Sequence, residues 1–389
     1  MYIFNPDNDL ALANFTSNYT PPASAQKLGA DLSLLPIWYA PDNSVVVSRS
    51  AIDAEFVASV RQRFGMSSRA IAFNEIARYH HRQIQPWGWS PLLKSQLKRA
   101  GVPDDLLPPQ AQLELMREYS DRKNAVALLQ ELKDGESRFC GSSFHFTDID
   151  PLLHYLSSIG GDKALKMPLS GSGRGLIWIF GEITDKQTDW ARRVIKSQGG
   201  VVAEPKLERV RDFAMEFSME NGKIIFEGYS LFESAASGAY VGNVLMSDGE
   251  IENHLAAYVS TDLLHGLRQS VLGKLVDYFP HYNGVLGVDM MICNTSDGYK
   301  IQPCVEINMR MNMGMVAHRF YERFVNNQSK GHYRVDYFKK PGEAFAHHQE
   351  KSVDFPLNVE NGRIESGYMS LTPVCEGTDY VAWVLVDRT

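Results

Sequence analysis

One short strand-like segment carries three polar side chains of three different kinds. The segment VEINMR, residues 305–310, alternates apolar residues with Glu306, Asn308 and Arg310. Because strand side chains alternate between two faces, the acid, the amide and the base are predicted to share one face. Carboxylate and amide oxygens suit a hard divalent cation, and a guanidinium suits phosphate oxygens. Taken alone, the segment also fits an edge strand with one solvated face.

The preceding segment supplies a second acid for the same place. Asp297 and Gly298 lie between two apolar runs and predict a two-residue hairpin turn. With that turn, Asp289 stands directly opposite Glu306, and Asn308 follows on the same face. Opposed carboxylates repel each other, and a divalent cation between them reverses the sign of the interaction. We therefore predict that Asp289, Glu306 and Asn308 bind magnesium, with manganese as an alternative ion; a longer loop would shift this register.

A glycine-rich loop follows a predicted strand that ends in a lysine. In ALKMPLSGSGRGLIWI, Lys166 lies on the strand, and the loop contains Ser170, Gly171, Ser172, Gly173, Arg174 and Gly175. Such a loop exposes backbone N–H groups that can hold an anion. The Walker A pattern is absent, and the dinucleotide G-x-G-x-x-G does not apply because the run after the loop is strand-like. The loop is either a flap over nucleotide phosphates or a flexible surface turn.

Length and composition restrict the class of protein. The chain has 389 residues, of which 44% are hydrophobic and 22% charged, as in a globular protein of two or three domains. A net charge of −7 disfavours nucleic acid and anionic membranes as partners. The 4 cysteines are widely spaced and predict reduced thiols in a cytoplasmic protein. No signal peptide and no membrane-spanning stretch is evident.

The pattern along the chain predicts a mixed α/β and α+β fold in four parts. Residues 1–105 alternate short apolar runs with helical stretches and predict an N-terminal α/β substrate domain. Residues 106–205 contain linker helices and a small subdomain with the glycine loop. Residues 206–330 form a larger subdomain with an Asn-Gly hairpin, a long helix from about 261 to 278 and the metal site. Residues 331–389 alternate as a C-terminal β-rich extension.

These parts, in this order, resemble the ATP-grasp superfamily. The matching segments lie within about residues 115–320 and are SDRKNAVALL, LKMPLSGSGRG, VVAEPKL, VDMMI and VEINMR. The resemblance implies that ATP lies between two α+β subdomains and that the N-terminal part is a pre-ATP-grasp-like domain. It also implies that Asp289, Glu306 and Asn308 are the magnesium ligands.

The resemblance further implies a contact with ATP for each remaining matched residue. Lys166 would bind the α-phosphate, residues 171–175 would cover the β- and γ-phosphates, and Arg310 would steady the transferring phosphoryl group. Lys166 and Arg310 are thus the predicted catalytic residues. Glu204 would accept from the adenine amino group.

Three further positions complete the expected nucleotide site. The Leu207 backbone would lie near the adenine, and Asp212 would hold the ribose hydroxyls. At the helix start the family often has Ser-Asp-Lys where this chain has Ser-Asp-Arg-Lys. Either Arg122 or Lys123 would therefore supply the first cation.

The family's usual chemistry gives the leading functional hypothesis. ATP phosphorylates a substrate carboxylate, and an amine then attacks the acyl phosphate with release of ADP and phosphate. The expected partners are ATP, a small carboxylate and an amine, and the oligomeric state is left open. A kinase acting on a hydroxyl and a non-catalytic ATP-binding sensor or scaffold are the alternatives.

Overall fold

The computed structural model describes residues 1–171, 175–235 and 237–388. The chain divides into two compact units. Unit 1 contains Met1–Glu114, Val241–Glu250 and Met311–Thr389, and unit 2 contains Leu115–Tyr240 and Ile251–Arg310. Three residues of the predicted glycine loop, Ser172, Gly173 and Arg174, lie outside the described residues. None of the described helices is long and apolar enough to cross a membrane.

Unit 1 begins with a small parallel sheet, as predicted for an N-terminal α/β part. Its strands are β1 (Tyr2–Ile3), β2 (Val45–Ser48), β3 (Arg69–Ala72) and β4 (Gln85–Pro86), in the order β3-β2-β1-β4. The helices are α1 (Asn8–Asn14), α2 (Ala23–Asp31), α3 (Ala54–Phe64) and α4 (Pro91–Arg99), with 3-10 turns at Leu35–Trp38, Phe73–Tyr79 and Asp104–Leu106. All four residues of β2 are buried, as the apolar run VVVS requires of a central parallel strand.

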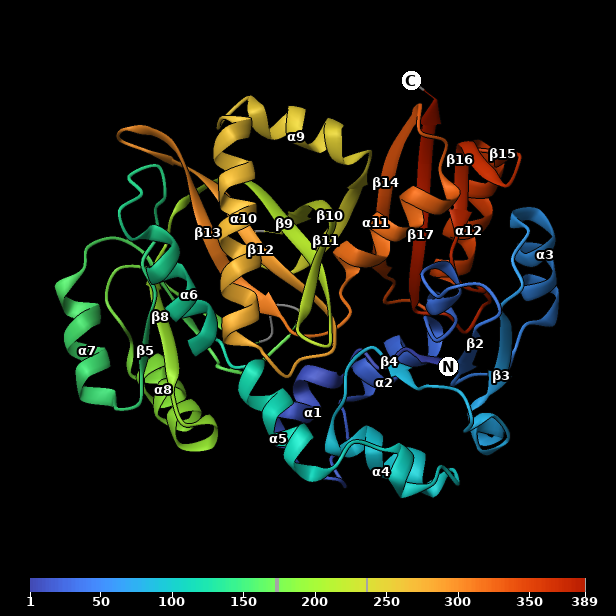
Figure 1. The fold of residues 1–389 in the computed structure, drawn as a ribbon, viewed down its shortest axis with the longest axis horizontal. Coiled ribbons are helices and arrows are strands. Elements are labelled where there is room, and N and C mark those ends of the chain that lie inside the picture. The colour runs from blue at the N-terminus through green and yellow to red at the C-terminus, as the bar shows by residue number, and fades with distance from the viewer. Residues whose placement is uncertain (172–174, 236, 389) are drawn as a thin grey trace. The chain divides into compact units, whose positions relative to one another are not determined.

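The C-terminal part of unit 1 is rich in β-strands, and one of them, β11, comes from well before the predicted extension at 331–389. Antiparallel strands β11 (Tyr240–Leu245), β14 (Ser329–Tyr337), β17 (Tyr380–Arg388), β16 (Arg363–Ser370) and β15 (Asn358–Glu360) follow one another across it. Helices α11 (Met313–Phe324) and α12 (Glu343–Asp354) accompany these strands (Figure 1). Trp38 donates its indole N–H to the Leu371 carbonyl at 2.6 Å, so the N-terminal and C-terminal parts share one packed unit.

Unit 2 contains a small antiparallel sheet that carries the glycine loop. Its strands are β5 (Phe144–Phe146), β8 (Val201–Pro205), β6 (Lys163–Lys166) and β7 (Leu176–Ile179), in the order β5-β8-β6-β7. Helices α7 (Ile149–Ser158) and α8 (Asp185–Gln198) bury their apolar faces against it. Lys166 pairs with Leu176 across the β6–β7 hairpin, so the glycine loop is the connection of a hairpin.

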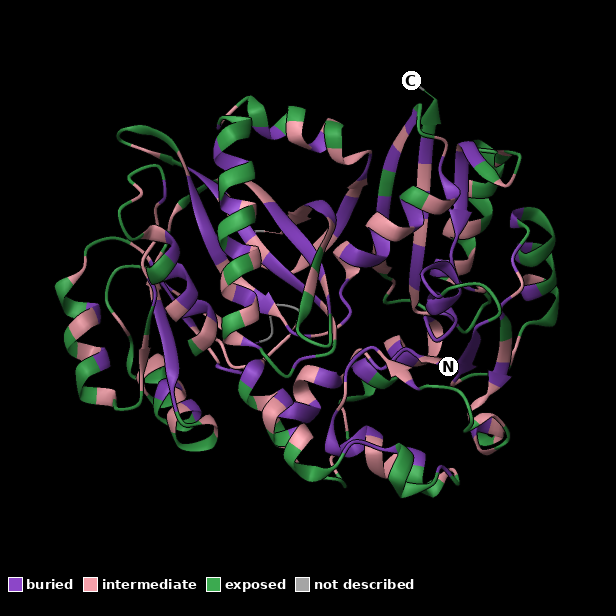
Figure 2. Ribbon diagram, viewed as in Figure 1, coloured by how far each residue is buried: buried purple, intermediate pink, exposed green. Residues whose placement is uncertain are grey.

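The larger sheet of unit 2 has the strand order β13-β12-β9-β10. The strands are β9 (Glu208–Glu220), β10 (Lys223–Ser234), β12 (Gly284–Thr295) and β13 (Gly298–Asn308). Asn221 and Gly222 both have positive φ, 52° and 75°, so the predicted Asn-Gly hairpin turn is confirmed. The other helices are α5 (Gln110–Tyr119), α6 (Lys123–Lys133), α9 (Asp248–Ala256) and α10 (Thr261–Tyr278). Buried residues gather in the middle of these strands, while α10 exposes its outer face (Figure 2).

The turn between β12 and β13 differs from the prediction. Thr295 pairs with Gly298, so Ser296 and Asp297 form the turn, one residue earlier than predicted. Position 298 still favours glycine, because its φ is 98°, a value that other residues rarely adopt. The predicted Asp297–Gly298 turn is therefore wrong.

A β-bulge restores the predicted pairing. Met291 faces Gln302, and the next paired position along the hairpin joins Asp289 to Glu306. Three residues of β13 thus stand against one of β12. Pro303 lies in this bulge, where its missing N–H removes no ladder hydrogen bond. The predicted opposition of Asp289 and Glu306 is confirmed, because the two extra residues of the bulge compensate for the earlier turn.

Candidate functional site

Three neighbouring strands of unit 2 bring acidic side chains to one face of the larger sheet. Asp289 on β12 pairs with Glu306 on β13, and Gly287 pairs with both Asn308 on β13 and Glu216 on β9. Directly paired residues share a face, and so do residues two apart on one strand. This set of Glu216, Asp289, Glu306 and Asn308 is called the polar face below.

The pKa of Asp289 is strongly perturbed. Burial raises the pKa of its carboxyl well above the usual value, and the charges of Glu306 and Glu216 raise it further. The Asn308 amide donates a hydrogen bond to Asp289 Oδ2 at 3.0 Å and partly offsets this effect. Asp289 is therefore a buried acid with two further carboxylates nearby, an arrangement that a bound cation would stabilise.

Glu306 has the opposite electrostatic environment. Burial alone would raise its pKa, but Arg122, Lys166 and Arg310 together outweigh burial, so the pKa of Glu306 is lowered. Arg122 Nη2 lies 2.6 Å from Glu306 Oε1. The two opposed acids thus have partners of their own in addition to any metal ion. A guanidinium compensates one acid and an amide partly compensates the other.

Arg122 connects the polar face to the start of the glycine loop. Its Nη1 donates to the Met167 carbonyl at 2.5 Å and to the Ser170 hydroxyl at 2.7 Å. The side chain is only 11% exposed. Lys123 is exposed, and its backbone N–H donates to the Asp121 carboxylate at the start of α6. Of the two cations left open by the sequence, the structure brings Arg122 to the other predicted residues and leaves Lys123 at the surface.

The described ends of the glycine loop are closely packed. The Met167 N–H donates to the Gly175 carbonyl at 2.8 Å. A Cβ on Gly175 would overlap the Ser170 hydroxyl, and it would lie 3.0 Å from Met167 Cβ. Position 175 therefore needs glycine because of the close approach of its neighbours. Gly171, at the other end of the gap, is half-buried.

Lys166 and Glu204 form an ion pair across adjacent strands of the small sheet. Glu204 pairs with Ala164, and Lys166 lies two residues along on the same face of β6. The two side chains are 13% and 14% exposed. Lys166 and Glu204, which the resemblance assigns to the α-phosphate and the adenine, thus contact each other directly. A bound nucleotide would have to contact both side chains of this ion pair or break it.

Asp212 and Leu207 lie at the start of the larger sheet. Asp212 is placed opposite Met291, on the same face as Asp289, and accepts from Arg209 Nη1 at 2.9 Å. Burial raises the pKa of Asp212 despite this partner. Leu207 lies between β8 and β9 and is half-buried. Asp212 is therefore a largely buried acid whose carboxylate is bound by Arg209.

Arg310 follows β13 directly and is half-buried. Its backbone N–H donates to the Asn308 carbonyl at 2.9 Å, which fixes the chain as it leaves the strand. Its charge lowers the pKa of both Glu306 and Asp289. Arg310 is thus close enough to act on both acids of the polar face.

Glu216 was not among the residues expected from the sequence. It is 1% exposed, and its charge raises the pKa of Asp289. A signal for it was present, because Asp212 and Glu216 are four residues apart on a predicted strand and so share a face. In the residues that the structure describes, no group of three or more His, Cys, Asp or Glu side chains has the arrangement of a metal site. The predicted ligand set contains two carboxylates and one amide, which is a donor set suited to magnesium.

No protein-family model matches the chain. No curated protein matches it either. Solved structures do match in fold. The N5-carboxyaminoimidazole ribonucleotide synthetase of Thermus thermophilus aligns over 100% of this chain and 94% of its own, with a TM-score of 0.52 and 12% identity. Biotin carboxylase from Campylobacter jejuni, in a complex described as β-γ-ATP, covers 100% of this chain and 87% of its own, with a TM-score of 0.50 and 11% identity.

The chain has the ATP-grasp fold. A third structure of this fold, N5-carboxyaminoimidazole synthase from Aspergillus clavatus in complex with ADP and 5-aminoimidazole ribonucleotide, aligns with a TM-score of 0.50 and 11% identity. It covers 90% of this chain and 95% of its own. At these identities the likeness establishes the ATP-grasp fold, and the predicted fold class is confirmed.

Proposed function

We propose that the protein is an ATP- and magnesium-dependent ligase that joins a carboxylate to an amine through an acyl phosphate. The observation that carries this proposal is the hydrogen-bonded link from Glu306, the cross-strand neighbour of Asp289, through Arg122 to Ser170. This link places an acidic metal-type face beside the start of a glycine-rich hairpin. The ATP-grasp fold supports it, because the three compared structures are a synthetase, a synthase and a carboxylase, two of them described with a nucleotide.

The chain's own residues have distinct roles in this proposal. Lys166 and Arg310 neutralise negative charge on the phosphates, so that the terminal phosphoryl group can move to the substrate carboxylate. Arg122 holds Glu306 and the first loop residue in place. The loop between Ser170 and Gly175 covers the phosphates with its backbone N–H groups. Glu204, Leu207 and Asp212 are the proposed adenosine contacts.

The polar face fits magnesium by the chemistry of its donors. Asp289, Glu306 and Asn308 would hold the ion, which supplies charge neutralisation for the phosphates when bound. Burial, with the charges of Glu306 and Glu216, raises the pKa of Asp289, and a bound cation would favour its ionised form. Asn308 now donates to Asp289, so its amide would turn to present oxygen to the ion.

The direct test follows the products. Purified protein, ATP, magnesium and a pool of small metabolites are assayed for ADP and phosphate, and hydroxylamine replaces the amine to trap an acyl hydroxamate. ADP, phosphate and hydroxamate are the expected products. Glu306→Gln is expected to abolish them, whereas Glu220→Gln, an exposed acid at the end of β9, leaves them unchanged.

Other product patterns would contradict the ligase proposal. AMP with pyrophosphate would show adenylation instead of phosphorylation. A stable phosphorylated product formed without any amine would identify a kinase. Tight ATP binding without turnover in any metabolite pool would identify a sensor or scaffold.

A further inference from the structure

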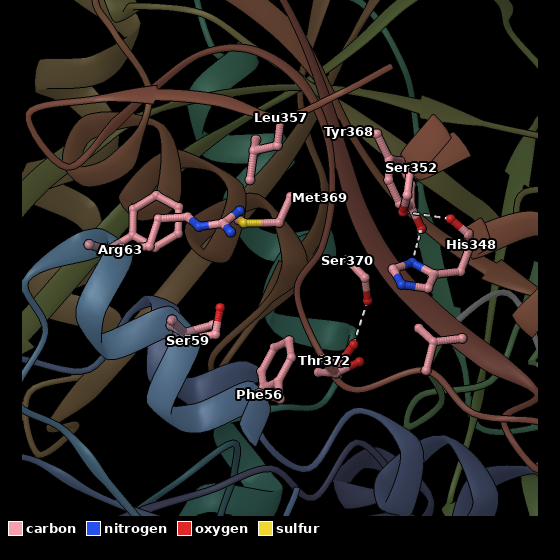
Figure 3. A pocket seen from close by; sticks show the side chains of 13 residues that line it. Phe56, Ser59, Arg63, His348, Ser352, Leu357, Tyr368, Met369, Ser370 and Thr372 are labelled. Carbon is pink, nitrogen blue, oxygen red and sulfur yellow. Dashed lines mark hydrogen bonds between the residues drawn. The ribbon is translucent and has the colours of Figure 1, made fainter. Parts of the chain in front are cut away.

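Unit 1 contains a pocket that the proposed function does not use. Its volume is about 330 Å³, and residues of α3, α12 and β16 and of the segments beside β16 line it (Figure 3). None of the nucleotide-site residues is in unit 1. Ligand pockets begin at about 300 Å³, so this one is large enough for a single ring or a branched aliphatic group.

The inner wall of the pocket is apolar and well buried. Val60 and Phe64 of α3, and Tyr368 and Met369 of β16, are each less than a tenth exposed. Phe56 adds a second aromatic ring from α3. Such a wall favours an apolar body by the ordinary gain from removing carbon surface from water.

Hydroxyl and imidazole groups form the rest of the lining. Tyr368 OH lies 3.2 Å from His348 Nδ1, and Ser352 donates to the His348 carbonyl at 2.7 Å (Figure 3). Ser370 donates to the Thr372 carbonyl. Thr372 is completely buried, and its own hydroxyl has no hydrogen-bond partner in the described part of the chain. The pocket thus has polar groups already fixed by neighbours and one that is unsatisfied.

The charge of the pocket comes from one residue. Of the described residues that line it, Arg63 is the only one with a fixed charge, and none is an acid. Arg63 is exposed, and its guanidinium has no hydrogen-bond or ion-pair partner among the described residues. Its side chain extends across the pocket toward Met369 in Figure 3. Burial lowers the pKa of His348, and the charge of His347 lowers it further, so the imidazole is neutral near pH 7.

We propose that this pocket binds a small organic monoanion with an apolar body, such as an aryl or branched-chain carboxylate. A single unpaired guanidinium can neutralise one negative charge, whereas an amine would find no counter-charge in the described lining. A phosphate dianion would leave one charge uncompensated. The buried aromatic and aliphatic wall accommodates the body of the ligand. The site is separate from the nucleotide chemistry and does not depend on the proposed function.

The test uses 3-(4-fluorophenyl)propionate as the probe, observed by fluorine NMR. Arg63→Gln is expected to weaken its binding about tenfold, the equivalent of one charge-assisted contact. Arg61→Gln removes the same charge two residues away on α3 but outside the lining, and is expected to leave binding unchanged. The uncharged amide of the probe is expected to bind the wild-type protein about as weakly as the acid binds the Arg63 variant.

A second variant checks the location of the probe independently. Ser59 is an exposed residue of the lining, so Ser59→Trp is expected to fill the pocket without disturbing the core and to prevent binding. Circular dichroism confirms that each variant is folded. The proposal is overturned if the wild-type protein does not bind the probe at millimolar concentration. It is also overturned if Arg63→Gln and Ser59→Trp both bind like wild type, since the probe then occupies another site.

Discussion

Replacing Arg122 by glutamine tests the connection between the polar face and the glycine loop. The change removes the ion pair with Glu306 and the hydrogen bonds to the Met167 carbonyl and the Ser170 hydroxyl. Breaking a fully buried pair costs about 3–5 kcal/mol. The Glu306 side chain is 28% exposed, so solvent screens part of the loss, and we expect the free energy of unfolding to fall by about 2–3 kcal/mol.

The assay is urea unfolding at several pH values, with ATP saturation kinetics alongside. Lys123→Gln is the matched control, because Lys123 is the next residue, has the same charge and is exposed. The control is expected to change stability by less than about 0.5 kcal/mol. The kcat/KM for ATP is expected to fall about 100-fold in the Arg122 variant and to be unchanged in the control.

The pH dependence of stability tests whether the Arg122–Glu306 ion pair itself accounts for the loss. The pKa of Glu306 is lowered from its usual value of 4.5, so the pair stabilises the folded state fully above that value. The contribution is lost as the pH falls through the lowered pKa. The stability difference between wild type and Arg122→Gln should therefore shrink in acid. Equal stability of the Arg122 and Lys123 variants at neutral pH would refute the reasoning.

Three further changes test the site at separate points. A buried carboxyl with a raised pKa makes the folded protein less stable once the pH is high enough to ionise it, so Asp289→Asn should raise the stability of the ion-free protein at neutral pH. The same change should abolish stabilisation by magnesium and ATP in thermal denaturation. Gly175→Ala should destabilise by about 1–3 kcal/mol through overlap with Ser170, whereas Gly160→Ala, which has open space, should not; urea unfolding compares them. Lys166→Met should raise the KM for ATP about tenfold in steady-state kinetics.

Alternation and turn residues predicted the opposed acids of the polar face. The strand period placed Glu306 and Asn308 on one side, and the structure confirms Asp289 as their neighbour. The exact turn was not predictable, because its position depends on a bulge that absorbs two extra residues around Pro303. Asp289 thus faces Glu306 only because the bulge compensates for the shifted turn.

Contacts between distant segments account for what the sequence did not predict. Arg122 reaches a residue 184 positions away, and no local pattern distinguishes it from Lys123. Glu216 is buried beside Asp289 because β9 lies next to β12, a neighbour relation that sequence spacing does not specify. The pocket around Arg63 likewise joins α3 to residues near the C-terminus. Such positions depend on the tertiary fold rather than on periodicity.

Manganese binding in the presence of ATP tests the central claim most directly, since paramagnetic resonance measures free Mn²⁺ without knowledge of the other substrates. Because ATP itself binds Mn²⁺, the wild-type protein is expected to deplete the free-ion signal beyond the loss that ATP alone causes. Glu306→Gln should restore that signal, whereas Asp297→Asn, at the exposed turn of the same hairpin, should not. Undiminished manganese binding by the Glu306 variant would contradict the account.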